Sequence, residues 1–561
     1  MSRFIMAQIN TRPGAVKANQ KRIAEIAAKH NDADLVVFPE MTLSGYPIGD
    51  LVERPDLLQA CRVAAENLAQ EFASGPAMLI GAPWQGEDLA AHIDRDQGSE
   101  RKPIYNAVLL LENGAVSCVT SKYHLPNEGI FDEKRNFVSE DFISGPIEIA
   151  GMRLGVMVCH DAWFEDVAET MAESGADAFV VLNASPYQRD GKLERRFQAL
   201  LSRVVETKKP LMMVNLVGAQ DGVVFDGTSV LINADCSIGY QAPAFIEDIA
   251  VVDWQGDQGL WRGKVADFTP QETRCIESEV YQAICLGLKD FVAKNGFEKV
   301  VLGLSGGVDS ALVAALAVDA LGADQVHGVM MPSPHTCQQS LDDAADLAQR
   351  LGITLDTVPI NPLMDSYAEV LKPTFALKGV AAENIQARIR GVVLMAASNQ
   401  SGALLLTTGN KSEIAVGYCT LYGDMSGGFN PIADLYKTEV YELCHWRNSS
   451  SDFTAGADCI PNAILERAPS AELAPNQADS DSLPDYSLLD QILRGIIEEN
   501  LGIDELVVQG LPRATVIRVL KLLDGAQHKR YQASIGVKLT SRGLKAEWRY
   551  PLTNQFCREL L

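Results

Sequence analysis

The sequence predicts an α/β protein made of two domains, and three observations support this. Short apolar runs alternate with amphipathic segments of helical period along most of the chain. One such series ends near residue 255, a second begins near residue 276, and a stretch rich in Gly, Trp and charged residues separates them. The length of 561 residues is enough for more than one hydrophobic core.

The first series opens with an expected strand over Phe4–Ile9. A helix is expected over residues 16–30, where Val16, Ile23 and Ile26 recur with charged residues between them. Further buried strands are expected over residues 35–38, 77–80, 108–111, 154–158, 179–182, 211–215 and 229–232. Residues 1–255 are therefore predicted to be the first domain, and residues 256–275 a linker.

The second series predicts a domain over residues 276–561. Helices are expected over residues 271–294, 311–321, 338–351 and 383–398, and strands over residues 300–304, 326–331, 354–359 and 403–408. Alternating βα units predict a doubly wound parallel sheet, whose ligands bind at the C-terminal ends of the strands. Residues 447–485, rich in Ser, Asp, Ala and Pro, are expected to form a mobile loop.

The composition excludes several classes of protein. No apolar run reaches the roughly 18–20 residues that span a bilayer, and the N-terminus has the pattern of a strand and not of a signal peptide. We therefore expect a cytoplasmic protein with no membrane partner. The net charge of −25 argues against binding nucleic acid. The 11 cysteines include no CxxC pair, which argues against structural zinc and a disulfide framework.

The strongest local signal is a loop between a predicted strand and a predicted helix. It consists of Gly303, Leu304, Ser305, Gly306, Gly307, Val308, Asp309 and Ser310. Free backbone N–H groups and the positive end of the helix dipole attract an anion at such a position. Gly306 and Gly307 let the backbone approach a phosphate closely, and Asp309 can hold Mg²⁺. No Lys-Ser/Thr pair follows the glycines, so this is not a Walker-type loop.

Three residues of the first domain follow strand-like runs and have the side chains that amide hydrolysis requires. They are Glu40, Lys122 and Cys159. Hydrolysis through a thioester needs a nucleophilic thiolate, a proton carrier and a positive group that stabilises the oxyanion. Taken singly, each is more often a salt-bridge glutamate, a surface lysine or a buried structural cysteine. The flanking motifs at residues 44–47, 131–135 and 183–186, together with Trp163, favour the catalytic interpretation.

These segments make residues 1–255 resemble the nitrilase superfamily, whose triad is Glu, Lys and Cys in that order. The resemblance implies an α-β-β-α sandwich. It implies that Glu40 is the general base, Lys122 stabilises the tetrahedral intermediate, and Cys159 is the nucleophile. The backbone N–H of residue 160 is expected to complete the oxyanion hole. Ser185 matches a glutamine-binding serine, and Lys192 matches a pocket lysine displaced by one position.

Two positions depart from the family pattern in the predicted glutamine pocket. His160 stands where the family commonly has Glu, and Glu128 stands where it commonly has an aromatic residue. The two changes are expected to compensate one another. Glu128 then supplies the carboxylate for the substrate ammonium that position 160 has lost.

The Gly303–Ser310 loop resembles the SGGxDS loop of ATP pyrophosphatases, and three further motifs resemble NAD⁺ synthetases. These motifs are ENIQAR at residues 383–388, TGNKSE at residues 408–413 and KR at residues 529–530. The resemblance covers residues 270–561 and implies a Rossmann-like sheet. It implies that the loop and Thr408 bind ATP. Residues implied to bind deamido-NAD⁺ are Asn384, Glu413 and Lys529, and those implied to bind Mg²⁺ are Asp309 and Glu413.

Together the two resemblances imply a glutamine-dependent NAD⁺ synthetase, a carbon–nitrogen ligase. The first domain is expected to hydrolyse L-glutamine, and the second to adenylate deamido-NAD⁺ with ATP. Ammonia then displaces AMP. Relatives form homo-oligomers, so we expect one here. Two alternatives stay open, namely another ATP-dependent amidotransferase and a nucleotide-binding sensor with a decayed amidase domain. The ENIQAR and TGNKSE motifs count against the first, and the intact Glu40, Lys122 and Cys159 oppose the second.

Overall fold

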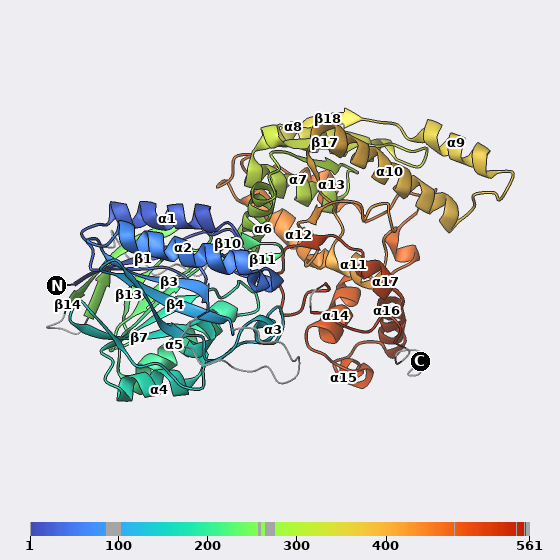
Figure 1. Ribbon diagram of the computed structural model, residues 1–561. Coiled ribbons are helices and arrows are strands. Elements are labelled where there is room, and N and C mark those ends of the chain that lie inside the picture. The colour runs from blue at the N-terminus through green and yellow to red at the C-terminus, as the bar shows by residue number, and fades with distance from the viewer. Residues whose placement is uncertain are drawn as a thin grey trace. The chain divides into compact units, whose positions relative to one another are not determined.

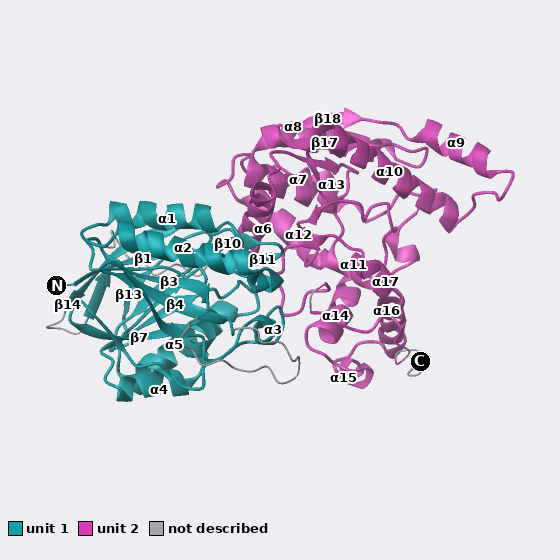
Figure 2. Cartoon of the chain, in the orientation of Figure 1, with its two compact units in different colours: residues 1–273 teal, residues 274–561 magenta. Residues whose placement is uncertain are grey.

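The computed structural model describes residues 2–85, 103–255, 260–263, 275–475, 477–545, 547–554 and 556. The chain divides into two compact units, residues 1–273 and 274–561 (Figure 2). Within the predicted linker, residues 260–263 form a strand of the first unit. The other linker positions, apart from Cys275, lie outside the described residues. The exact domain boundaries therefore stay a prediction.

The first unit contains two large sheets and a small hairpin (Figure 1). The seven-stranded sheet has the order β15-β14-β1-β2-β3-β4-β5, and the six-stranded sheet the order β13-β12-β9-β8-β7-β6. The first comprises β1 Ser2–Gln8, β2 Leu35–Val37, β3 Ala77–Trp84, β4 Tyr105–Glu112, β5 Ala115–Ser121, β14 Asp248–Gln255 and β15 Leu260–Gly263. The second comprises β6 Ile147–Ile149, β7 Met152–Val158, β8 Ala178–Asn183, β9 Leu211–Asn215, β12 Val230–Ile232 and β13 Ile238–Gln241. The hairpin is β10 Val217–Gln220 with β11 Val223–Asp226.

The alternation of side chains along the strands explains how these sheets pack. Phe4 of β1 shares an apolar cluster with Val156 of β7, so the two sheets pack face to face. The next residue, Ile5, points to the other side and packs with helices α1 (Val16–Lys29) and α2 (Pro55–Glu71). Beyond the second sheet, Met157 packs with α4 (Glu165–Glu173) and α5 (Lys192–Thr207). The predicted α-β-β-α sandwich is confirmed.

The second unit is built on a parallel sheet with the order β18-β17-β16-β19. Its strands are β16 Val300–Gly303, β17 Val326–Met330, β18 Thr354–Thr357 and β19 Leu404–Leu405. The helices along this part of the chain are α6 Ile276–Lys294, α7 Val308–Leu321, α8 Gln338–Leu351, α9 Asn361–Leu371, α10 Val380–Ser401, α11 Lys411–Val416 and α12 Lys437–Ser449. The chain steps outward from β16 to β18 and then returns to the opposite side at β19. This is the predicted doubly wound topology, and it places the ends of β16 and β19 at the switch point where ligands bind.

The C-terminal part of the second unit adds a helical layer. Helices α14 (Tyr486–Ile497), α15 (Ile503–Val508) and α16 (Arg513–Gly525) form an apolar cluster with residues of α11. The remaining elements are α13 Asn462–Glu466, α17 Gln527–Arg530, and the paired strands β20 Phe429–Asn430 and β21 Ile535–Gly536. The predicted loop over residues 447–485 thus contains the end of α12 and the short helix α13. Among the described helices, none has both the length and the apolarity needed to cross a membrane.

Candidate active sites

The first candidate site lies where strands of both large sheets end. Glu40 follows β2, Lys122 follows β5, and Cys159 follows β7 as the first residue of a 3-10 turn over Cys159–Trp163. Their side chains come from segments far apart in the sequence and are all buried, with exposed fractions of 1% for Glu40, 0% for Lys122 and 6% for Cys159. The structure thus brings the predicted triad into one buried site.

Lys122 is the centre of a buried network of charges. Its Nζ donates to Glu40 Oε1 at 2.8 Å and to Glu133 Oε1 at 2.9 Å. The same two carboxylates accept further bonds, from Asn106 Nδ2 to Glu40 Oε1 at 2.7 Å and from Tyr46 OH to Glu133 Oε1 at 2.7 Å. Burial alone would lower the pKa of Lys122, but the charges of Glu133 and Glu40 outweigh it and raise that pKa. The lysine therefore stays cationic.

Glu40 presents one bound and one free oxygen. Oε1 accepts bonds from both Lys122 and Asn106, whereas the buried Oε2 has no hydrogen-bond partner among the described residues. Leaving a buried polar atom unsatisfied costs on the order of 1–3 kcal/mol, and more for a charged group. Such an exception in a folded protein needs a functional explanation. Glu40 Oε2 is therefore free to accept a proton, and so is Glu133 Oε2, which is also buried without a partner among the described residues.

Cys159 lies in an unusual backbone conformation beside these charges. Its φ of 46° is in the left-handed region, which residues other than glycine rarely adopt outside functional sites. Burial raises the pKa of the Cys159 thiol, Glu40 raises it further, and Lys122 and a hydrogen bond with the backbone of Ala184 lower it. Burial and Glu40 dominate, so the resting group is a thiol. A nucleophilic attack by Cys159 therefore requires a base within the site.

The predicted glutamine-binding residues lie in different environments. Glu128 is exposed in the loop between β5 and the short helix α3 (Glu133–Asn136). Ser185 is buried after β8, and its backbone N–H donates to Asn215 Oδ1 at 3.0 Å. Lys192 begins α5, and its Nζ lies 5.5 Å from the ring centroid of Phe131.

His160 lies near three basic side chains. Burial, followed by the positive charges of Lys122, His124 and Lys192, lowers the pKa of His160 to about 4. Its ring makes an edge contact with that of Phe164, at 5.1 Å between centroids. The imidazole is therefore neutral at neutral pH, and it does not replace the carboxylate that the family commonly has at this position.

Sequence reasoning missed three residues of this site, namely Glu133, Tyr46 and Asn106. Glu133 and Tyr46 lie inside motifs that were used for the resemblance, but no role was assigned to them. Asn106 lies inside an apolar strand, where a single buried amide is a signal that a polar partner is nearby. Glu133 is one of the two carboxylates that hold Lys122, and Tyr46 and Asn106 orient these carboxylates.

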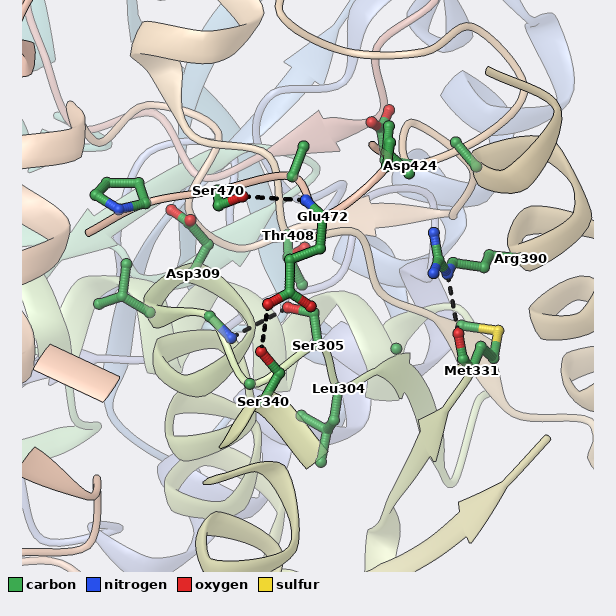
Figure 3. Close-up of a pocket in the computed structure, with 18 of the residues that line it drawn as sticks. Leu304, Ser305, Asp309, Met331, Ser340, Arg390, Thr408, Asp424, Ser470 and Glu472 are labelled. Atoms are coloured by element: carbon green, nitrogen blue, oxygen red, sulfur yellow. Dashed lines mark hydrogen bonds between the residues drawn. The ribbon is translucent and has the colours of Figure 1, made fainter. Parts of the chain in front are cut away.

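The second candidate site is a cavity of about 320 Å³ at the C-terminal edge of the parallel sheet (Figure 3). Residues 303–309 of the predicted loop line it, together with Thr408, Glu413, Asp424 and Lys437. Ser310 lines a smaller adjoining cavity of about 120 Å³, which shares Asp309 and Thr408 with the first. The predicted ATP-binding residues are therefore brought together.

The loop has the backbone geometry of an anion site. Gly306 has a φ of 79°, and a Cβ atom added there would lie 2.3 Å from the backbone oxygen of Ser340. Only glycine fits, because any side chain would both strain the backbone and displace α8. Ser310 Oγ donates to the carbonyl of Gly307 at 2.9 Å, and this bond secures the first turn of α7. The first N–H groups of α7 lack acceptors within the helix, and Val308 and Asp309 of that turn line the cavity.

Asp309 and Glu413, the predicted metal ligands, converge on one cation. Lys437 Nζ donates to both carboxylates, and its distance to Glu413 Oε1 is 3.1 Å. Burial raises the pKa of Glu413 to about 7, with Lys437 opposing and Asp309 reinforcing the shift. Within the described ranges, no three His, Cys, Asp or Glu side chains form a group that could hold a metal ion. Two carboxylates beside a phosphate loop nevertheless fit Mg²⁺, which commonly takes its other ligands from phosphate and water.

Two of the predicted deamido-NAD⁺ ligands do not line the cavity. Asn384 Oδ1 accepts a bond from Thr420 Oγ1 at 2.9 Å. Lys529 Nζ donates to the carbonyls of Gly417 and Cys419 at 2.7 and 2.8 Å. Both residues hold the segment 417–420, whose Tyr418 does line the cavity. Glu413, the third predicted ligand, lines both cavities.

The segment 468–473 covers part of the cavity and brings a carboxylate to the loop. Ser340 Oγ donates to Glu472 Oε1 at 2.7 Å, and Figure 3 shows this carboxylate directed toward Ser305 and Ser340. Arg390 lines the cavity from α10, and its Nε donates to the carbonyl of Met331 at 3.1 Å. Glu472, Arg390 and Lys437 had no predicted role, because their importance depends on which segments fold over the loop.

Replacing Gly306 with alanine should weaken the nucleotide binding expected of the second unit. The added methyl group overlaps the backbone of Ser340, and the left-handed φ disfavours alanine, so the loop must move. We expect the Kd for ATP, measured by isothermal titration calorimetry, to rise at least about tenfold, which corresponds to about 1.4 kcal/mol. The control is Gly525→Ala, where the added methyl group meets no atom within 4 Å. Unchanged ATP affinity in Gly306→Ala would show that the loop does not bind the nucleotide.

Comparisons with known proteins match both units. The carbon-nitrogen hydrolase family model matches residues 6–262, and the NAD synthase family model matches residues 280–533. The glutamine-dependent NAD(+) synthetase of Rhodobacter capsulatus is 47% identical, covering 99% of this chain and 98% of its own length. That of Acinetobacter baylyi is 39% identical over 98% of both chains.

A solved structure agrees with the sequence relatives. The glutamine-dependent NAD⁺ synthetase of Acinetobacter baumannii, in complex with adenosine diphosphate, has a TM-score of 0.76 and 38% identity. The match covers 99% of this chain and 98% of that one. Identity at this level along the whole chain, with both family models matched in order, establishes the assignment. The chain belongs to the glutamine-dependent NAD⁺ synthetase family.

Proposed function

We propose that the two sites divide the glutamine-dependent synthesis of NAD⁺ between them. The first unit hydrolyses L-glutamine to glutamate and ammonia. The second adenylates the nicotinate carboxylate of deamido-NAD⁺ with ATP and releases pyrophosphate, and ammonia then displaces AMP. One observation supports this proposal. The chain that buries Glu40, Lys122 and Cys159 in one site also has a glycine-rich loop, over residues 303–310, of the kind that binds phosphate.

The geometry of the first site supports a thioester mechanism. Glu40 Oε2 accepts the thiol proton of Cys159, and Sγ attacks the amide carbon of glutamine. Lys122 and the backbone N–H of residue 160 stabilise the resulting oxyanion. The C–N bond breaks as Glu40 returns the proton to the leaving ammonia. Glu40 then takes a proton from water, which attacks the thioester and releases glutamate and the free thiol.

The glutamine pocket is proposed to lie around Glu128, Ser185 and Lys192. Lys192 is a cation near neutral His160, which suits the substrate carboxylate. Glu128 is proposed to bind the substrate ammonium, because the family carboxylate at position 160 is absent. Its exposed position on the loop before α3 leaves it accessible to a ligand.

The second site is proposed to activate a carboxylate, which is otherwise a poor electrophile. The loop and Thr408 bind the phosphates of ATP through backbone N–H and hydroxyl groups, and the adenosine diphosphate in the Acinetobacter baumannii relative supports a nucleotide here. Asp309 and Glu413 would hold Mg²⁺, which neutralises phosphate charge during transfer. The deamido-NAD⁺ site is proposed to include Asn384, Glu413 and Lys529. Asn384 and Lys529 contribute by holding the segment 417–420. The need for ATP supports a cytoplasmic location.

Replacing Cys159 with alanine should separate the two half-reactions. Purified protein is supplied with deamido-NAD⁺, ATP and Mg²⁺, and NAD⁺ formation is followed with glutamine or with ammonium. We expect Cys159→Ala to lose glutamine-dependent synthesis, because the nucleophile is gone, and to keep the ammonium-dependent rate. The control is Cys61→Ala, a buried cysteine on α2. If the wild type forms no NAD⁺ from either source, the proposed substrate is wrong.

Replacing Glu128 with alanine should weaken glutamine binding alone. The KM for glutamine is expected to rise about tenfold or more, because a charge-assisted contact to an ammonium contributes about 1.5–3 kcal/mol. The ammonium-dependent rate should not change. Glu112→Ala, an exposed glutamate at the end of β4, is the matched control. An unchanged KM for glutamine in the Glu128 variant refutes the compensation between positions 128 and 160.

The second unit is proposed to associate with a second copy of the chain through α9 and α10. Helix α9 has no buried residue, yet it carries exposed Leu363, Tyr367 and Val370. Exposed Phe375 and Val392 extend this apolar surface toward and along α10. Exposed apolar side chains on neighbouring helices, as on α9 and α10, commonly mark an interface.

Light scattering after size exclusion tests this association. We expect Val370→Glu to reduce the molar mass of the wild-type species, because a charge is placed in the apolar interface. Val508→Glu, on the exposed face of α15, should leave the mass unchanged. A monomeric wild type, or a Val370 variant with the wild-type mass, contradicts the proposal.

A further inference from the structure

The predicted triad poses a positioning problem. Lys122 directly follows a strand of the seven-stranded sheet, whereas Cys159 directly follows a strand of the six-stranded sheet. The two sheets meet through an apolar cluster of side chains. Apolar contacts are non-directional, so they hold the sheets together without fixing one catalytic atom against another. A directional link between the two strand ends is needed.

Asp161 provides that link. Its Oδ1 accepts the backbone N–H groups of Tyr123 at 3.1 Å and His124 at 2.8 Å. Its Oδ2 accepts the backbone N–H of Val158 at 3.1 Å. Tyr123 and His124 directly follow Lys122, and Val158 directly precedes Cys159. One carboxylate therefore ties the backbone that carries the lysine to the backbone that carries the nucleophile.

These hydrogen bonds are the ones that join the two segments. Within the described part of the chain, no other hydrogen bond connects residues 122–124 with residues 158–161. Asp161 is 2% exposed, so water does not compete for its oxygens. Bonds from N–H groups to a carboxylate are about twice as strong as those between neutral groups. His124 Nε2 also lies 2.9 Å from Asp166 Oδ1 of α4, but this contact is between side chains. Asp161 therefore supplies the strong link that reaches the backbone of both segments.

Burying the carboxyl group of Asp161 has a desolvation cost that a merely space-filling residue would avoid. Burial raises the pKa of Asp161 to about 7, while the amides of His124 and Val158 and the charge of Lys122 oppose this shift. Asp161 makes no hydrogen bond with Lys122 Nζ, whose partners are Glu40 and Glu133. The hydrogen bonds of Asp161 therefore act on the backbone and not on the lysine side chain.

We propose that Asp161 is a positioning residue for glutamine hydrolysis, which sets Lys122 against Cys159 by binding the backbone on both sides. This inference rests on the proposed glutaminase activity of the first unit. An asparagine at this position keeps the shape but loses one acceptor oxygen, and its NH₂ group would face a backbone N–H. The two strand ends would then separate by a fraction of an ångström or more. A misplacement of about 1 Å in an active site reduces the rate by about 100-fold.

The first test compares steady-state kinetics of the wild type, Asp161→Asn and Asp177→Asn. Asp177 is the matched control, because its carboxylate also accepts a backbone N–H, that of Arg153, at the far end of β7. We expect Asp161→Asn to lower kcat for glutamine about 100-fold with a KM within about twofold of the wild type. Ammonium-dependent NAD⁺ synthesis should not change. Asp177→Asn should match the wild type in every assay.

The second test distinguishes positioning from a loss of structure. Alkylation of Cys159 by iodoacetamide at pH 8 is followed by mass spectrometry of the Cys159 peptide. Lys122 lowers the pKa of the Cys159 thiol, so moving Lys122 away raises that pKa and slows alkylation several-fold. A disrupted site would instead expose the thiol and accelerate alkylation. Slower alkylation in Asp161→Asn therefore supports the proposal, and faster or unchanged alkylation overturns it.

The outcomes separate this inference from the proposed function. A wild type that hydrolyses no glutamine refutes the function itself. A wild type that is active beside an Asp161→Asn variant with unchanged kcat refutes only the positioning role. If Asp161→Asn does not fold, Asp161→Glu is judged by the same two tests. That variant keeps the buried charge and moves both oxygens by about one bond length, so it should also lower kcat and slow alkylation.

Discussion

The site of the first unit depends on one interaction, the burial of the Lys122 ammonium between the carboxylates of Glu40 and Glu133. Removing three charges from water costs several kcal/mol per ion, and such a cluster persists only when its geometry and hydrogen bonds are nearly complete. Asn106 and Tyr46 meet this requirement by donating to the same carboxylates. The exceptions are Glu40 Oε2, Glu133 Oε2 and Asn106 Oδ1, which are buried without a hydrogen-bond partner among the described residues. The constraint therefore orders the site and leaves one oxygen of each carboxylate without a donor.

The two units place a lysine between two carboxylates in different environments. In the first, the side chains of Lys122 and Glu40 are completely buried, so the cluster is fixed. In the second, the side chains of Asp309 and Glu413 around Lys437 are 18% and 17% exposed and border a cavity. A buried cluster keeps its charges pre-organised for reaction. In a cluster beside a cavity, a charged ligand is able to replace one of the ion-pair partners. We therefore propose that the same pattern serves catalysis in one unit and ligand binding in the other.

The sequence predicted most of the architecture that strong periodicity controls. Strands β1, β7 and β8 are nearly continuous apolar runs, and the loop at Gly306 carries its own conformational requirement. Strand β5 was missed because its residues alternate between exposed and half-buried positions and include few large apolar side chains. Glu133 and Asp161 were missed for another reason: their roles arise from contacts with residues distant in the sequence. Conversely, the ENIQAR motif predicted that Asn384 binds a ligand. Asn384 does not line the cavity, and its side chain accepts a hydrogen bond from Thr420.

The 3-10 turn after β7 contains both the strained residue Cys159 and the proposed positioning residue Asp161. Cys159 adopts a left-handed conformation that costs on the order of 1–3 kcal/mol, and such strain persists only where the surroundings determine it fully. Asp161 belongs to the same turn and accepts the N–H of Val158, the residue that enters it. The bonds that align Lys122 therefore also stabilise the strained turn of the nucleophile. Placing both tasks on one carboxylate means that the thiol cannot relax without also disturbing the backbone that carries its lysine.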